Sequence, residues 1–171
     1  MTAYQFTVIV ASVPTAAQVH ALMALDDGPR VVRNEREGIG RVRFRRSRPD
    51  LADAVVSAVR DVEAMGLRPV RLVDQDWVNL ADIAERIGRS REAVRLWSIG
   101  RVGPGGFPPP LNPGRETLFY SWADVAPWLR ERMGLDVPEP EWVLVAANLG
   151  LRLRALAPRV PRMDLVRGLL P

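Results

Sequence analysis

Residues 80–97 read LADIAERIGRSREAVRLW, and their apolar residues recur at the three- and four-residue spacing of two short helices. Gly88 falls between the two runs, where a tight corner needs a residue that tolerates positive φ. Ser90 follows as the expected N-cap of the second helix, because its hydroxyl can accept a hydrogen bond from a free backbone N–H of the first turn. Ala84, Gly88 and Val94 are small enough to let the helices cross closely. The stretch therefore predicts a helix-turn-helix.

Each of the two predicted helices has an apolar and a polar side. The apolar side of the first helix consists of Leu80, Ile83, Ala84 and Ile87. The second helix turns Val94 and Trp97 inward, and we interpret Trp97 as a core residue. Its outward side consists of Arg91, Glu92 and Arg95.

The composition is that of an ordinary soluble globular protein with room for one domain or two small ones. The chain has 171 residues, of which 47% are hydrophobic and 26% charged. It has no cysteine and one histidine, His20, which excludes disulfides, thiolate metal sites and a histidine-based zinc site. No apolar run approaches the roughly 20 residues of a membrane span. Residues 6–13 are apolar but lack the basic region of a signal peptide, so we expect a cytoplasmic protein of a prokaryotic cell.

All 24 basic residues are arginine. Contact with nucleic acid is one explanation, and a GC-rich genome is another, because its codons favour Arg, Ala, Gly and Pro together. The 13 glycines and 15 prolines fit the genomic explanation. A net charge of only +4 argues weakly for a polyanionic partner, so the local placement of the arginines has to decide.

Residues 1–75 alternate in the order strand, helix, strand, strand, helix, strand. Period-two and helical patterns indicate these elements at 4–11, 15–25, 31–36, 39–45, 51–65 and 67–73. The inward positions of the first helix are expected to be Val19, Leu22 and Met23, and Asp50 is the expected cap of the second. This order is typical of a ferredoxin-like plait, an antiparallel sheet with two helices on one face.

The other face of that sheet has to meet water or a partner. On its third strand Arg41, Arg43 and Arg45 alternate with apolar residues and therefore share one side. This side is either an auxiliary DNA or RNA surface, a solvated face whose charge prevents edge pairing, or a surface for dimerisation or ligand sensing. The aromatic residues with which RNA-binding plaits stack bases are missing, which favours the solvated face.

Residues 98–135 continue the helix-turn-helix with the pattern of a hairpin and a third helix. Residues 107–111 are expected to form an edge strand, because their prolines cannot donate to a ladder, and residues 118–120 the return strand. The tip is a type II turn at residues 112–115. The third helix is expected to start near Asp124, which places Pro127 in its first turn, and to end at Gly134.

Residues 79–133 resemble the winged helix-turn-helix of MerR proteins and phage excisionases. The resemblance rests on the helix-turn-helix, the G-F-P-x-P strand at 106–110, the Pro-Gly turn with arginine, the aromatic strand and the D-V-x-x-W-L motif at 124–129. It implies that the second helix enters the major groove while the wing contacts the flanking backbone. The candidate DNA-binding residues are Arg89, Ser90, Arg91, Glu92, Arg95, Arg101, Arg115 and Tyr120, with a core position as the alternative for Tyr120.

Arg95 matches the arginine in the middle of the family's recognition helix. Glu92 departs from the pattern, because its carboxylate repels phosphate unless it accepts a hydrogen bond from a cytosine amino group. No cysteine follows the motif, so the metal-sensing function of some relatives is not expected here.

Residues 136–171 are expected to be a helical extension after a stiff proline linker. Apolar residues follow helical spacing from Trp142 to Leu156, and Asp164 is a candidate cap of a last short helix. In MerR-like proteins a helix at this place often pairs two chains. Two heptads are too short for a self-sufficient coiled coil, so packing within the chain is favoured and a homodimer stays open.

The sequence thus predicts an α+β protein of three segments, a plait at 1–75, a winged helix-turn-helix at 76–135 and a helical extension at 136–171. The leading hypothesis for its function is sequence-directed binding of double-stranded DNA, by a bacterial transcription regulator or nucleoid-type organiser associated with the nucleoid. The alternative is a protein-interaction or assembly module. We expect no enzyme, cofactor or metal site, because no paired carboxylates, nucleophile–base set or phosphate loop stands out.

Overall fold

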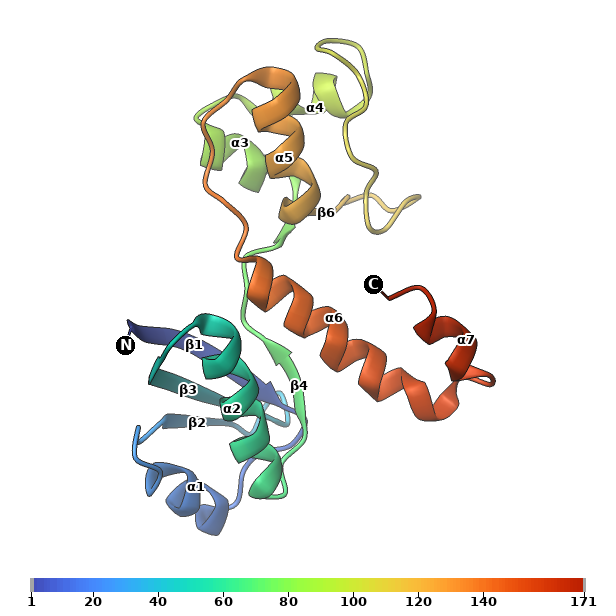
Figure 1. Ribbon diagram of the computed structural model, residues 1–171. Coiled ribbons are helices and arrows are strands. Elements are labelled where there is room, and N and C mark those ends of the chain that lie inside the picture. Colours follow the sequence, from blue (N-terminus) through green and yellow to red (C-terminus); the bar gives the residue numbers. More distant parts are fainter. Residues whose placement is uncertain (1, 171) are drawn as a thin grey trace. The chain divides into compact units, whose positions relative to one another are not determined.

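The computed structural model describes residues 2–170, which form two compact units of mixed α+β structure (Figure 1). Of the described residues, unit 1 combines 2–73 with 146–170, and unit 2 is residues 74–145. This division differs from the three expected segments, because the C-terminal residues group with the N-terminal ones.

Unit 1 contains a four-stranded antiparallel sheet whose strand order is β2-β3-β1-β4. Its strands and helices alternate along residues 2–72 in the expected order, with ends a few residues from those predicted. They are β1 (Thr2–Val10), α1 (Ala16–Met23), β2 (Arg30–Asn34), β3 (Ile39–Arg48), α2 (Leu51–Ala64) and β4 (Pro69–Leu72). Since β1 and β3 occupy the middle of the sheet, the edge strands are β2 and β4.

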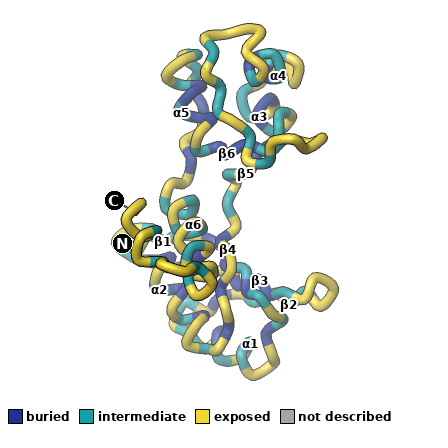
Figure 2. Tube along the Cα trace, turned by 90° about the vertical axis from the view of Figure 1, so that its right-hand side faces the viewer, coloured by how far each residue is buried: buried dark blue, intermediate teal, exposed yellow. Residues whose placement is uncertain are grey.

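The pleat of the two central strands buries one sheet face. Val8 lies opposite Val42, and Phe6 lies opposite Phe44 with the two rings stacked 5.7 Å apart. Both helices lie on this side of the sheet in Figure 1, and buried residues are dark blue in Figure 2. Leu22 is fully buried as predicted, but the inward prediction for Met23 is wrong. Met23, the last residue of α1, is 59% exposed.

The C-terminal helix α6 (Trp142–Leu156) packs against unit 1 through its residues from 146 onward. The carboxamide of Asn148 accepts a hydrogen bond from the N–H of Leu72 at 2.7 Å and donates to the carbonyl of the same residue at 3.0 Å. The amide therefore replaces a neighbouring strand at the edge of β4. Arg154 forms an ion pair with Glu63 of α2, and η1 (Ala157–Arg159) and α7 (Met163–Arg167) complete the chain.

Unit 2 contains two short helices joined by a tight corner and a two-stranded antiparallel sheet. Its elements are β5 (Trp77–Val78), α3 (Leu80–Ile87), α4 (Arg91–Ser98), β6 (Tyr120–Ser121) and α5 (Trp122–Met133). The predicted corner is confirmed, because Gly88 ends α3 with φ of +64° and the hydroxyl of Ser90 accepts from the N–H of Ala93 at 3.1 Å. Val94 and Trp97 are buried in the core, as expected.

The expected hairpin between α4 and α5 is not formed as a strand pair. Residues 107–111 are irregular, and β6 pairs instead with β5. The three prolines at 108–110 have no N–H to donate, so a single backbone hydrogen bond, from the N–H of Leu111 to the carbonyl of Phe119 at 2.7 Å, joins the two arms. The turn at the tip is present, with Gly114 at φ of +79°.

The predicted start of α5 near Asp124 is wrong, since the helix begins at Trp122 and contains Pro127 in its second turn. The cap is supplied from a distant residue. One carboxylate oxygen of Asp76 accepts from the N–H of Ala123 at 2.7 Å and from the hydroxyl of Ser121 at 3.0 Å. The Asp76 carboxylate therefore satisfies a backbone N–H of the first turn, and the helix can begin two residues before the expected start at Asp124.

Candidate nucleic-acid interface

Helix α4 is held rigidly by its inner side. Trp97 packs on Trp128 of α5 with ring centroids 6.2 Å apart, and Val94 is fully buried between the helices. The preceding helix α3 is fixed by a capping box, in which Asn79 accepts from the N–H of Asp82 and that carboxylate accepts from the N–H of Asn79. The outward side of α4 is therefore presented in one defined orientation.

Three of the predicted binding residues lead into or begin that outward side. Arg89, Ser90 and Arg91 are all exposed. Ser90 is already used as the N-cap of α4, so its hydroxyl supports the helix start. Neither Arg89 nor Arg91 has a carboxylate within ion-pair distance in the described part of the chain. These two guanidinium groups are available to an anion.

Arg95 is engaged by Glu92 in a two-pronged ion pair. Its Nε and one terminal nitrogen each donate to a different carboxylate oxygen at 2.7 Å. The hydrogen bond from Arg95 lowers the pKa of the Glu92 carboxyl, and the same bond raises the pKa of Arg95. The charges of Arg91 and Arg101 lower the pKa of Glu92 further. Glu92 thus neutralises the charge of Arg95 on the outward side of α4.

The loop from residue 99 to 119 leaves α4 and returns to β6 (Figure 1). Its base is anchored, because Trp128 donates from its indole N–H to the carbonyl of Gly105 at 3.0 Å and also contacts the ring of Phe107. Its tip is closed by Asn112, whose side chain bonds to the backbone of residues 117 and 119. Arg101 and Arg115 are exposed on this loop.

Tyr120 is not a surface residue, which corrects its prediction as a DNA contact. Only 2% of it is exposed, and Phe107 packs edge-on against its ring at 5.4 Å. The reason is that β6 pairs with β5 and therefore lies inside unit 2. The structure brings together Arg91, Glu92, Arg95 and Arg101, whereas Arg115 stands apart in the loop near its tip and Tyr120 belongs to the core.

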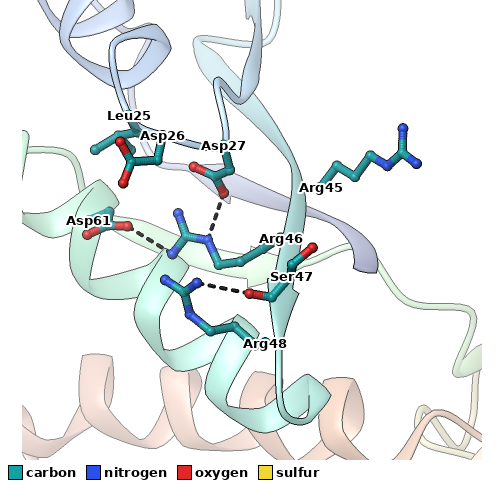
Figure 3. Close-up of a pocket in the computed structure, with 8 residues that line it drawn as sticks. All are labelled: Leu25, Asp26, Asp27, Arg45, Arg46, Ser47, Arg48 and Asp61. Atoms are coloured by element: carbon teal, nitrogen blue, oxygen red, sulfur yellow. Dashed lines mark hydrogen bonds and ion pairs between the residues drawn. The ribbon is translucent and has the colours of Figure 1, made fainter. Parts of the chain in front are cut away.

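A buried arginine in unit 1 was not singled out from the sequence. Arg46 is 3% exposed, and its guanidinium contacts Asp27 at 2.7 Å and Asp61 at 2.8 Å (Figure 3). It also donates to Ser57 at 3.0 Å and lies over the ring of Phe44. Burial lowers its pKa, and the hydrogen bonds to the two carboxylates together with their charges raise it by more.

The burial of Arg46 could have been predicted from its position in β3, because every second residue of this strand faces inward. Arg46 follows Val42 and Phe44 on the buried parity, whereas Arg45 points to the opposite side of the strand in Figure 3. In the pocket beside it, Arg46 is paired with both Asp27 and Asp61, so we interpret this cluster as a structural clamp between β3, α2 and the loop after α1.

Among residues 2–170, no helix is long and apolar enough to cross a membrane, and no three or more His, Cys, Asp or Glu side chains gather so that they could hold a metal ion. Comparisons with protein-family models, with curated proteins and with solved structures find no match for this chain.

Proposed function

We propose that this protein binds double-stranded DNA through the outward side of α4, with the loop at residues 99–119 beside it on the phosphate backbone. The observation that carries the proposal is a short helix, locked by Val94 and Trp97, that presents Arg91 to solvent without a competing carboxylate within ion-pair distance among the described residues. An α-helix of this kind fits the major groove, where arginine recognises guanine in two-point contact.

The family and fold belong to the same proposal. Unit 2 is a MerR- and excisionase-type winged helix-turn-helix in which an irregular loop stands in for the wing, and the sheet of unit 1 is a ferredoxin-like plait. The matching element order and the sheet order β2-β3-β1-β4 support the second assignment. The protein acts without catalysis as a regulator or nucleoid organiser in the cytoplasm, and a homodimer places two copies of α4 on two half-sites.

The residues contribute unequally under this proposal. Arg89, Arg91 and Arg101 are free to meet DNA, and Arg115 reaches it from the loop. Arg95 contributes less than its place in the motif suggests, because Glu92 holds both prongs of its guanidinium. Binding falls steeply with salt, since each phosphate contact releases counterions.

A docking module for another protein is the second candidate. The Glu92–Arg95 pair favours it, together with a balance of eight arginines against seven acidic side chains in residues 76–135. Ile99 and Val102 directly after α4 are 50% and 52% exposed, which suits an apolar contact better than a phosphate backbone.

The discriminating experiment is a titration of labelled duplexes, selected from random sequence, against the full chain and two variants. Arg91→Gln should weaken binding by about 1–3 kcal/mol, or roughly 5- to 150-fold, and relax specificity at one base pair. Arg132→Gln is the matched control, because it removes the same charge from an exposed position of α5. Equal losses of DNA affinity in both variants would mean that Arg91 contributes only its charge and that α4 makes no specific contact. No binding by the wild-type chain at low salt would refute the proposal and favour the docking module.

A further inference from the structure

The sheet of unit 1 has an open face on which arginines are concentrated. Arg41, Arg43 and Arg45 project from β3, and Arg30 of β2 lies directly opposite Arg43 in the strand register. We call these four residues the arginine face. All four are exposed, whereas Val42 and Phe44 between them are fully buried on the other side.

The face is segregated by charge. Its strand positions on β1, β2 and β3 contain no acidic residue and no aromatic one; they are Ala3, Gln5, Thr7, Ile9, Arg30, Val32, Asn34, Ile39, Arg41, Arg43, Arg45 and Ser47. Arg41 has a partner in Glu37 at 3.4 Å, and this pair is half-exposed on both sides. Arg30, Arg43 and Arg45 have no ion pair within the described residues.

Protection of a sheet edge does not explain this arrangement. Charged residues commonly occupy edge strands, where they prevent pairing with other chains. β3 is an inner strand, covered by β2 on one side and β1 on the other, so it needs no such protection. The opposition of Arg30 and Arg43 is unfavourable in isolation, because like charges directly across a ladder repel. A bound polyanion removes that repulsion.

We propose that the arginine face binds the phosphate backbone of double-stranded DNA. Residues two apart on a strand lie about 6.8 Å from each other and cross-strand neighbours about 5 Å, so the four guanidinium groups can engage several phosphates at once. The face lacks aromatic side chains on which bases of a single strand could stack. It therefore holds the duplex by charge and does not read sequence.

This inference concerns a second surface on the other unit and is independent of α4. If both surfaces bind, each raises the local concentration of DNA for the other, because the two units belong to one chain.

The test compares two double variants of the full chain by titration with a random-sequence duplex at several salt concentrations. Arg43→Gln with Arg45→Gln removes two charges from the arginine face, and Arg152→Gln with Arg159→Gln removes two exposed charges from the C-terminal region. Each phosphate contact contributes about 0.9 log unit to the association constant at 0.1 M salt. Loss of two contacts should therefore make the first variant bind about 60-fold more weakly. The slope of log K against log salt should become shallower by about 1.8. Circular dichroism and the midpoint of thermal unfolding confirm that both variants are folded.

The outcomes separate this inference from the proposed function. If the arginine-face variant keeps the wild-type affinity and salt slope while Arg91→Gln loses affinity, the arginine face is not a DNA surface and the α4 proposal stands. The opposite result supports the arginine face and overturns α4. Equal weakening of DNA binding in the two double variants would also overturn this inference. So would tighter binding of the full chain to polyglutamate, a polyanion without phosphate, than to the duplex.

Discussion

Replacing Arg46 by methionine should destabilise unit 1, because two carboxylates then lose their shared cation. Removing one partner of a buried ion pair costs about 3–5 kcal/mol. The side chain of Asp27 is 15% exposed and stays largely dry, whereas that of Asp61 is 38% exposed and regains water. The expected cost is therefore at the lower end, about 3 kcal/mol. Methionine keeps the contact with the ring of Phe44, so the loss reports the charges.

The distribution of tryptophan makes this effect measurable. All five tryptophans lie between residues 77 and 142, within unit 2, so fluorescence follows that unit while far-UV circular dichroism follows both. In a urea titration we expect the dichroism transition of unit 1 to fall by about 2 M, at a slope near 1.5 kcal/mol per M. The fluorescence transition should keep the wild-type midpoint.

Two further variants show whether the ion cluster is the cause. The triple change Asp27→Asn, Arg46→Met and Asp61→Asn removes all three charges and should recover most of the loss, since the unpaired buried charge is gone. Arg48→Ala is the control, because Arg48 meets Asp53 only at 3.7 Å in an exposed pair and should cost about 0.5 kcal/mol or less. A wild-type dichroism transition for Arg46→Met, or no recovery in the triple variant, would refute the reasoning.

Three other predictions concern unit 2. Asp76→Ala removes the distant cap of α5 and should lower the stability seen by tryptophan fluorescence by about 2 kcal/mol; an unchanged midpoint would mean that water replaces the carboxylate. Gly88→Ala should cost about 1 kcal/mol in the same assay, because a Cβ meets no atom within 4 Å and only the positive φ is penalised; a cost above about 3 kcal/mol would point to crowding. The carboxyl pKa of Glu92, followed by NMR, should lie below its usual range and rise toward it in Arg95→Gln, where the charges of Arg91 and Arg101 remain. The stabilisation from this pair is then present above the ordinary pKa of a glutamate and is lost as the pH falls through the lowered value. An equal pKa of Glu92 in the wild type and in Arg95→Gln would disprove the pairing in solution.

Local features of the sequence were sufficient for the elements themselves. Gly88, Ser90 and Asp50 act within one turn of their own position, so the corner between α3 and α4 and the start of α2 could be predicted from spacing alone. The alternation along β3 likewise assigned Arg41 and Arg45 to the open side, because successive residues of a strand face opposite ways. The outward position of Arg91 followed from the same kind of periodicity.

The tertiary structure alone decided which of these residues are available. Asp76 caps a helix 47 residues away, Asn148 closes the edge of β4 across 76 residues, and Arg46 draws in Asp27 from the loop after α1. Tyr120 became a core residue because β6 pairs with β5. The periodicity of the sequence cannot predict these contacts, because each depends on how distant segments of the chain meet. The sequence by itself therefore determined the helices, the strands and their outward arginines, and the packing of distant segments determined which charges are neutralised and which face a partner.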